Sequence, residues 1–522
     1  MSHTPQRRRG IAALTVLAAG AMLLGACSSP GQSTSPGATA GANSTVRIMM
    51  DSDMATYGYD PIRYGTGQVM FYEGLYDSLF AMDADGNPVP QLVTSFSYNA
   101  DNTQLTLHLD TTSTFTDGAK LTAQLVKDNL DQRNDATLSA YASFATGGGA
   151  EIKDVSVVDD STVTLTFASA QPGFEANLVM PAGAILGPNA IADRTILGQA
   201  PDGSGPLALD TARTVKGTNY VLTKRSDYTG SKQMAFDTYI FTGALDPQSR
   251  VNALGAGDAD LVMITSDKVD QVKGLGKTVA QNGGTVQNML VFDRTGDTAP
   301  AFASQDVRNA LSIAIDRQAV VDAISPGDRP TANALPQASP GYDASLDTAF
   351  AYDPAKAKQM LADAGYPDGF SFNFLVSDQS QTTVELLQTY WAAIGVTVTL
   401  RTASSTEEAF ASVTTDPMGG PNAMTWTNPA GNVFGQIMGW MNPHNAVDPA
   451  LMDATNAVGA ATTDADRATA LKALNDAIVQ GGSLMPLYEQ YATWGYDQSV
   501  VAAPTFPGTF NYPRLVDLKP AS

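Results

Sequence analysis

The chain has one cysteine, Cys27, in 522 residues. It can therefore form no internal disulfide, and packing alone must stabilise its folded parts. Basic residues are also scarce, because 30 lysines and arginines stand against 52 acidic residues, for a formal net charge of -22. This balance argues against a nucleic-acid partner, whose phosphates require Lys and Arg.

Metal-binding and catalytic motifs are equally rare. Beyond the N-terminal segment the chain keeps two histidines, His108 and His444, and neither has a cluster of ligands around it in the sequence. No HExxH motif, CxxC pair or GxSxG motif occurs. The string GLGKT at 274–278 resembles the end of a phosphate-binding loop, but Gln271 stands where that loop needs glycine. We expect no metal, no cofactor and no enzymatic activity, and whether His444 contacts a ligand stays open.

The first 26 residues have the pattern of an export signal. Three arginines at 7–9 precede an apolar run at 11–26, which is shorter than the ~20 residues that span a bilayer. The string LGAC at 24–27 looks like the lipobox of bacterial lipoproteins. This predicts a signal peptide at 1–26, lipidation of Cys27, and anchoring at the extracytoplasmic face of the cell membrane. The export route, Sec or twin-arginine, stays open.

The segment that follows is too polar and small to fold. Residues 28–44 contain no charge and no large apolar side chain, so they cannot bury enough surface to form a core. We expect 27–44 to be a disordered tether. The rest of the chain exceeds a single core in length, and 43% of all residues are hydrophobic, so it should divide into two or three lobes.

The stretch FYEGLYDSLF at 71–80 predicts a helix. Phe71, Leu75 and Leu79 recur at the spacing of one apolar helix stripe. Glu73 lies between aromatic residues, and no nearby residue supplies a catalytic partner for it. We expect Glu73 to be an exposed or hydrogen-bonded acid of the scaffold.

Residues of about 77–195 predict a compact α+β lobe. The leucines of QLTLHLD alternate as in a half-buried strand, with His108 on the opposite face. Thr122 is placed to cap a helix that runs to about 133. Two further alternating runs flank a turn at 159–161 and predict a hairpin.

The second half predicts an α/β lobe. Residues 307–324 have the apolar spacing of one amphipathic helix, and another helix begins near Pro354 and stops at Gly365. FSFNFLV, TTVELLQTYWAAIG and VTVTL give the strand, helix and strand of a right-handed parallel crossover. We assign Trp391 and Trp494 to core packing.

Nine segments, taken in order, carry a resemblance to a known family. They are Asp60-Pro61, FYEGLYDSLF with DGNPVPQLV, FTDGAKLTAQLVKDNL, GPLAL, RVNALGAGDADL, FASQDVRNALSIAIDR, DPAKAKQMLADAGY, YWAAIGVTVTL and SLMPLYEQYA. In this order they resemble the family 5 solute-binding lipoproteins of bacterial ABC importers, of the oligopeptide and dipeptide type. The resemblance covers nearly all of the chain after the tether. It implies an α/β fold, a three-domain clamshell like that of periplasmic binding proteins (type II, cluster C-like), with two inter-lobe crossings near 286 and 486.

The resemblance also implies how the chain divides. Domain I is assembled from 45–76, 196–285 and 487–522. Domain II is the insertion at 77–195, and domain III is 286–486.

For function, the resemblance implies an extracellular binding component of an ABC importer. It would capture a peptide or similar small polar solute by hinge closure and deliver it to ABC permease subunits in the membrane. We expect a monomer. Two alternatives stay open, namely a binding protein for an oligosaccharide or other uncharged solute, and a secreted enzyme or adhesion lipoprotein on the same fold.

Enclosed binding sites combine aromatic walls with a few polar groups. This predicts ligand-binding residues in the loop before the first helix, in the Trp-containing segment of the second half, and at three further positions. In that order they are Tyr57, Tyr59, Tyr64 and Thr66; Trp426, Thr427, Asn428 and Phe434; and Trp440, Tyr141 and Tyr488.

The Trp-containing segment also bears on the charge of the ligand. In peptide-binding members an aspartate just after the Trp-containing segment pairs the peptide's α-amino group, whereas TWTNPAGNVF has no acid between Trp426 and Phe434. A buried ammonium without a carboxylate is costly. A peptide with a free amino group would therefore need Asp51, Asp53 or Asp60 as a substitute, and an uncharged polar solute would suit the segment equally well.

Overall fold

The computed structural model describes residues 44–63, 68–134, 152–168, 170–376, 380–402, 406–426, 429–461, 463–508 and 510–521. These residues belong to one compact unit, Asn43–Ser522. The predicted signal peptide, Cys27 and all but the last residue of the tether lie outside the described residues. Within these ranges, no helix is long and apolar enough to cross a membrane.

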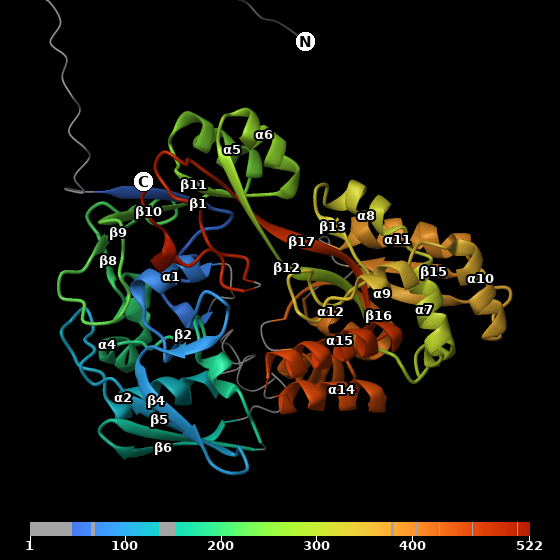
Figure 1. The fold of residues 1–522 in the computed structure, drawn as a ribbon, viewed down its shortest axis with the longest axis horizontal. Helices are drawn as coiled ribbons and strands as arrows, with labels where there is room; N and C mark the ends of the chain where they lie inside the picture. The colour runs from blue at the N-terminus through green and yellow to red at the C-terminus, as the bar shows by residue number, and fades with distance from the viewer. Residues whose placement is uncertain are drawn as a thin grey trace, which may run out of the picture. The chain divides into compact units, whose positions relative to one another are not determined.

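A nine-stranded mixed sheet runs through the unit (Figure 1). Its order is β16-β12-β17-β11-β1-β10-β9-β8, and β13 pairs with β17 beside this path. β1 is parallel to β10 and β11, and the other pairs are antiparallel. The strands are β1 (Thr45–Met50), β8 (Leu207–Leu209), β9 (Tyr220–Lys224), β10 (Thr238–Gly243), β11 (Leu261–Ile264), β12 (Thr278–Val291), β13 (Arg329–Pro330), β16 (Met418–Thr425) and β17 (Leu484–Tyr496).

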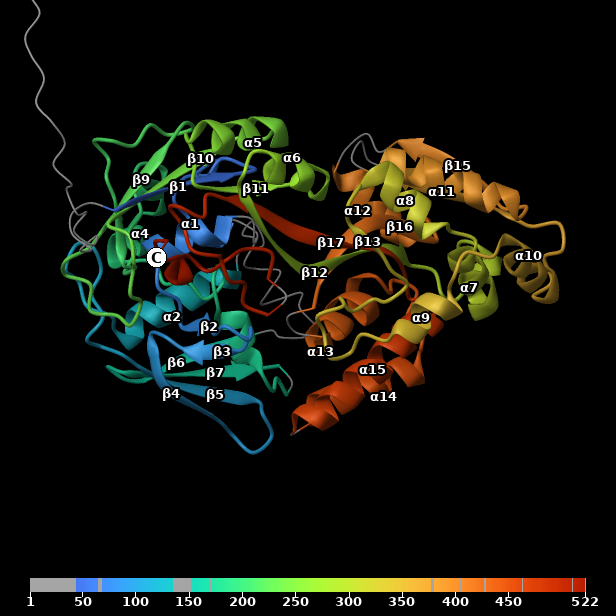
Figure 2. The same ribbon diagram turned by 45° about the horizontal axis from the view of Figure 1, so that its top comes forward.

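Two long strands of this sheet, β12 and β17, belong to two hydrophobic cores. Figures 1 and 2 both show them side by side along their length. Trp494 and Tyr496, near the end of β17, pack in the β1 core, which also contains Val46, Ile48, Phe71 and Leu75. The opposite ends of both strands, 289–291 and 484–488, pack in the α7 core, which also contains Val307, Leu311 and Trp391. The predicted crossings near 286 and 486 fall within these strands.

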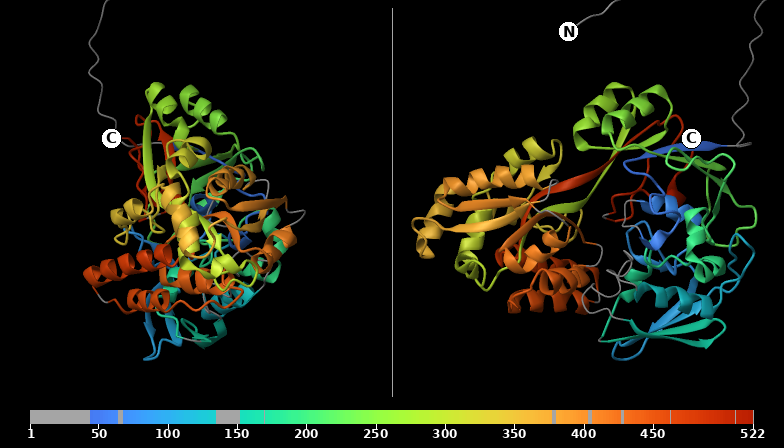
Figure 3. Two further views of the ribbon diagram at one scale, coloured as in Figure 1. Left: turned by 90° about the vertical axis from the view of Figure 1, so that its right-hand side faces the viewer. Right: turned by 180° about the vertical axis from the view of Figure 1, so that it is seen from behind.

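A separate four-stranded antiparallel sheet forms a third core, the β5 core (Figure 3, blue and teal). Its order is β4-β5-β7-β6, for β4 (Val93–Tyr98), β5 (Gln104–Leu109), β6 (Ile152–Asp159) and β7 (Thr162–Phe167). The leucines of β5 are buried and His108 is exposed, as the alternation predicted. The Thr122 hydroxyl accepts from the Leu125 amide at 3.1 Å and caps α2 (Ala123–Asp131). The predicted strand, cap and hairpin are confirmed.

The predicted parallel crossover is also confirmed (Figure 2). β14 (Ser371–Val376) pairs parallel with β15 (Thr397–Thr402), and α11 (Gln381–Ala393) connects them. Trp391 on α11 is fully buried, and its indole N–H donates to the Leu311 carbonyl at 3.0 Å. Both Trp391 and Trp494 therefore have the packing role that the sequence indicated.

The described part of the chain contains further helices. They are α1 (Val69–Leu75), α4 (Pro188–Ala192), α5 (Pro247–Ala256), α6 (Val269–Gly274), α7 (Gln305–Ile313), α8 (Arg317–Ile324), α9 (Ala344–Ala349), α10 (Pro354–Asp363), α12 (Thr406–Thr415), α13 (Pro429–Asn432), the π-helix η9 (Val433–Trp440), α14 (Pro449–Ala460) and α15 (Asp464–Gln480). A short hairpin joins β2 (Phe80–Met82) to β3 (Pro88–Pro90).

Two predicted helices end earlier than the apolar spacing indicated. Residues 307–324 form two helices rather than one, because Asp316 leaves the helix and its carboxylate caps α8 by accepting from the Ala319 amide at 3.1 Å. The helix at 71–80 stops at Leu75, because Tyr76 is extended. Leu79 therefore packs in the β5 core and not beside Phe71. In both places the apolar residues are buried as expected, but by separate elements.

Candidate functional site

Five of the predicted ligand-binding residues lie outside the described residues. They are Tyr64, Thr66, Tyr141, Thr427 and Asn428. Their role stays a prediction, and the site is built below from the remaining candidates.

The two described tyrosines of the loop after β1 differ in their exposure. Tyr57 is exposed, at 65% of its surface. Tyr59 is 2% exposed and packs in the β1 core, with its ring centroid 6.3 Å from that of Phe71 and 6.2 Å from that of Tyr220. Tyr59 is thus buried among other aromatic rings, and its role in ligand binding stays a prediction.

The π-helix η9 carries two of the aromatic candidates, Phe434 and Trp440. Single π-helical turns inside helices are rare and often lie at functional sites. Phe434 is half-buried, whereas Trp440 is 42% exposed, with its ring centroid 6.3 Å from that of Phe292. Trp440 is thus held against the protein on one side and open to a ligand on the other.

Trp426 and Tyr488 are buried in the α7 core. Trp426 is 4% exposed, and its buried indole N–H has no acceptor among the described residues. Since an unmade hydrogen bond of this kind costs about 1–3 kcal/mol, Trp426 is a candidate donor to a solute oxygen. Tyr488 is 6% exposed, lies opposite Pro330 and Gln287 in the sheet, and has a pKa raised by burial. Its position in the middle of the sheet favours packing over the predicted ligand contact.

His444 lies in the loop after η9. Its Nδ1 is 3.2 Å from Asp297 Oδ2, and its buried Nε2 has no partner in the part of the chain that the structure describes. Across the described ranges no three His, Cys, Asp or Glu side chains are grouped as metal ligands. His444 therefore offers one polar atom to a solute, and nothing around it completes a metal site.

A small cavity of about 50 Å³ lies between α1, the β2–β3 hairpin and the C-terminal segment. Its apolar wall comes from Val69, Met82, Met180, Phe510 and Tyr512. Val69 comes two residues after position 67 in the sequence, so this wall of the cavity is close in sequence to the candidates Tyr64 and Thr66.

The C-terminal wall of the cavity, 507–514, was missed by the sequence reasoning. It is tied to the two shared strands: the Asn282 side chain on β12 donates to the carbonyls of Gly508 and Phe510 at 2.9 and 2.8 Å, and the Trp494 indole on β17 donates to the Asn511 carbonyl at 3.1 Å. The aromatic and proline-rich run TFPGTFNYP was the available signal, but its place in space depends on these long-range bonds.

The three acids that could replace the missing aspartate differ in the hydrogen bonds and ion pairs that they already form. Asp60 is 2% exposed, and both of its oxygens accept from the Arg194 guanidinium, at 2.7 and 3.0 Å. Asp53 accepts from the Tyr220 hydroxyl at 2.5 Å. Asp60 is therefore already neutralised by an arginine, Asp53 is partly occupied, and Asp51 stays a candidate.

A family match decides the chain's relationship. The sequence pattern of the bacterial extracellular solute-binding proteins, family 5 (middle), matches residues 87–459. The chain belongs to this family. The predicted resemblance is thereby confirmed, and a family described by solute binding supports the expectation that the chain is not an enzyme.

Two curated relatives illustrate the family's range. The glutathione-binding protein GsiB of Salmonella typhimurium is 29% identical over 323 residues, which cover 60% of this chain and 60% of GsiB. Heme-binding protein A of Haemophilus influenzae is 27% identical over 428 residues, which cover 74% of this chain and 75% of that protein. The match thus spans less than two thirds of the length of the glutathione-binding relative.

Solved structures share the fold over a larger part of the chain. HbpA2 from Haemophilus parasuis has a TM-score of 0.74 at 20% identity and covers 91% of this chain and 99% of its own. The periplasmic binding protein DppA from Helicobacter pylori, in complex with the peptide STSA, has a TM-score of 0.72 at 19% identity and covers 92% and 98%. These likenesses confirm the predicted α/β fold of the periplasmic binding proteins.

The family description also bears on location. Its members are described as extracellular, which supports the expected place outside the cytoplasm. Anchoring through Cys27 stays a prediction.

Proposed function

We propose that this family 5 protein is the solute-binding component of an ABC importer, and that it captures a peptide or a similar small polar solute. The observation that carries the proposal is the pair β12 and β17, whose two ends pack in different cores. A solute that contacts the part of the protein around the β1 core and the part around the α7 core at once favours the arrangement in which these two parts close on it.

The shared strands contain the irregularities that bending requires. Their register shifts between Gly283 and Thr285 and again between Gln287 and Asn288. Such bulges interrupt the hydrogen-bond ladder and increase the local twist. We infer that the hinge bends at 283–288, because both shifts lie between the segments that pack in the two cores.

The aromatic candidates fit a small polar solute. Trp440 offers an exposed ring, and the buried N–H of Trp426 lacks an acceptor among the described residues. We place a peptide first, since DppA of the same fold was solved with one. An oligosaccharide or other uncharged solute is the second candidate, favoured by the absence of an acid between Trp426 and Phe434.

The proposal extends to partners and location. We infer that Cys27 is lipidated and holds the protein at the extracytoplasmic face of the membrane, where it would act as a monomer and deliver its solute to ABC permease subunits. The three-domain division is part of the same proposal, with domain I from 45–76, 196–285 and 487–522, domain II at 77–195 and domain III at 286–486.

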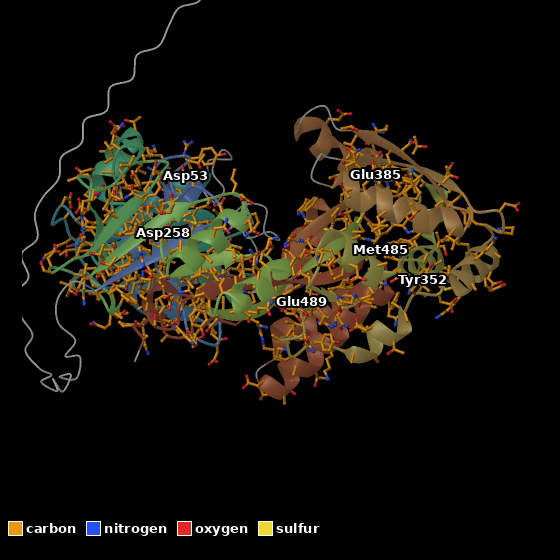
Figure 4. The ribbon with its side chains drawn as sticks, turned by 90° about the horizontal axis from the view of Figure 1, so that it is seen from above. Asp53, Asp258, Tyr352, Glu385, Met485 and Glu489 are labelled. Carbon is orange, nitrogen blue, oxygen red and sulfur yellow. The ribbon has the colours of Figure 1, made fainter. Side chains whose placement is uncertain are left out.

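Thermal denaturation of the full chain against peptides, oligosaccharides and metal chelates tests this proposal. A one-site ligand at 100 times its dissociation constant adds about 2.7 kcal/mol to the free energy of unfolding. Trp440→Ala should reduce that gain, whereas Tyr352→Ala, which removes another exposed ring (45% exposed; Figure 4), should keep it. Turnover of a substrate with no stabilising solute would overturn the proposal.

A further inference from the structure

Glu73 is the one acid among the described residues that line the cavity beside α1. The two cations near it contact other groups. Lys232 Nζ lies 3.1 Å from Asp77 Oδ1 and donates to the carbonyls of Glu73 and Tyr76 at 2.8 and 3.1 Å. Arg514 Nε pairs with Asp517 at 2.5 Å. Within the described residues, no Lys or Arg forms an ion pair with the Glu73 carboxylate.

The charges around the cavity therefore do not balance. Four carboxylates, those of Glu73, Asp77, Asp517 and Asp227, are near three cations, Lys232, Arg514 and Arg225, which leaves one negative charge. Burial raises the pKa of Glu73, and the nearby Lys232 offsets only part of this effect. Glu73 is half-buried and has no ion-pair partner among the described residues, and such a carboxylate gains from a cationic ligand.

The local hydrogen bonds leave room for such a ligand. One oxygen of Glu73, Oε2, accepts from the Leu515 amide at 2.8 Å, which fixes the side chain in place. Among the described residues, no donor is bonded to the other oxygen. Glu73 is thus the hydrogen-bonded scaffold acid that the sequence predicted. Its second carboxylate oxygen accepts no hydrogen bond from the described residues.

The cavity walls suit an ammonium group on a short alkyl stem. The aromatic side chains of Phe510 and Tyr512 line it, and such rings attract cations through their faces. Met82 and Met180 supply apolar surface for the stem. A volume of about 50 Å³ equals only a few water-sized spheres, so the cavity holds the end of a solute rather than a whole one.

We propose that this cavity is a subsite for the primary ammonium end of the captured solute, with Glu73 as its counterion. The inference rests on the proposed function, since it names the chemical class of the solute. It also supplies the carboxylate that the segment between Trp426 and Phe434 lacks. Solutes with a free amino group would then be preferred over neutral or anionic ones of equal size.

Calorimetric titration of the full chain with n-butylamine, n-butanol and butyrate tests this subsite. Butylamine should bind saturably, and the neutral and anionic analogues should bind at least about tenfold more weakly, because neither carries the positive charge that pairs with the Glu73 carboxylate. Glu73→Gln should weaken butylamine binding by a similar factor, since it removes the charge but keeps an oxygen for the Leu515 amide. Glu385→Gln, at an exposed position on α11 (Figure 4), is the matched control and should bind as the wild type does.

A second measurement keeps the test decisive if Glu73→Gln does not fold. Butylamine binding to the wild type should weaken as the pH falls and Glu73, whose pKa is raised by burial, takes up a proton; binding that does not change on acidification refutes the subsite. Equal binding of butylamine and butanol, or of wild type and Glu73→Gln, refutes it too. Solute capture itself would still stand on any peptide or sugar that stabilises the protein, and would fall only if no solute does.

Discussion

Adding one methyl group to β12 at Gly283 should disturb the ion pair between Glu489 on β17 and Arg329 on β13. A Cβ on Gly283 would lie 2.2 Å from Glu489 Oε1 and 3.3 Å from the Tyr491 ring. Glu489, labelled in Figure 4, is fully buried on β17. Its Oε2 accepts from Arg329 Nε and Nη2 at 3.0 and 2.8 Å, and from the Gln337 amide at 3.1 Å. The methyl group therefore displaces a carboxylate that has no space to move without losing these bonds.

The expected cost follows from this geometry. Removing one partner of a buried ion pair costs about 3–5 kcal/mol, because the other charge is left unpaired. Gly283→Ala moves the carboxylate rather than deleting it, so we expect the lower end of this range, a loss of about 3 kcal/mol in the free energy of unfolding.

Urea denaturation followed by far-ultraviolet circular dichroism measures this loss. Gly459→Ala in α14 is the matched control, because its Cβ would have no atom within 4 Å. Alanine is favoured over glycine inside a helix, so this variant should gain up to about 1 kcal/mol. If Gly283→Ala were as stable as the wild type, the packing of β12 against Glu489 would be refuted.

Three further predictions concern acid stability, the aromatic residues and the anchor. Burial alone would raise the pKa of Asp293, but amide and hydroxyl donors of the 295–299 turn more than offset it and lower the pKa. Ionised Asp293 therefore stabilises the fold above about pH 4, and this stabilisation is lost as the pH falls through the folded-state pKa. Asp293→Asn should lower the free energy of unfolding by about 2 kcal/mol at neutral pH. When the urea midpoint is plotted against pH, the variant should show a smaller decrease at acidic pH than the wild type. Trp391→Ala should cost about 3–5 kcal/mol in urea denaturation, whereas Trp440→Ala should cost under about 1 kcal/mol and instead weaken solute binding; the reverse order would contradict their assignments. Cys27→Ser should move the protein from the membrane to the soluble fraction on cell fractionation, and retention in the membrane would argue against lipidation.

Local signals predicted those elements in which propensity and packing agree. The alternation in β5, the Thr122 cap of α2 and the crossover through α11 each combine a local pattern with a buried face. The break at Asp316 was missed, since apolar spacing continues across it while a side-chain cap ends the continuity.

The candidate site was harder to predict than the fold. An aromatic residue in a loop has the same local sequence whether it faces solvent or packs inward, which is why Tyr59 and Tyr57 were predicted alike but differ in exposure. The cavity wall at 507–514 owes its position to side chains on β12 and β17 that are distant in sequence. Periodicity within a window cannot detect such bonds.

Small-angle X-ray scattering of the full chain, with and without a stabilising solute, tests most directly whether two bodies close about β12 and β17. We predict that the radius of gyration falls when the solute saturates the protein. A saturating solute that leaves the radius of gyration unchanged would contradict capture by hinge closure.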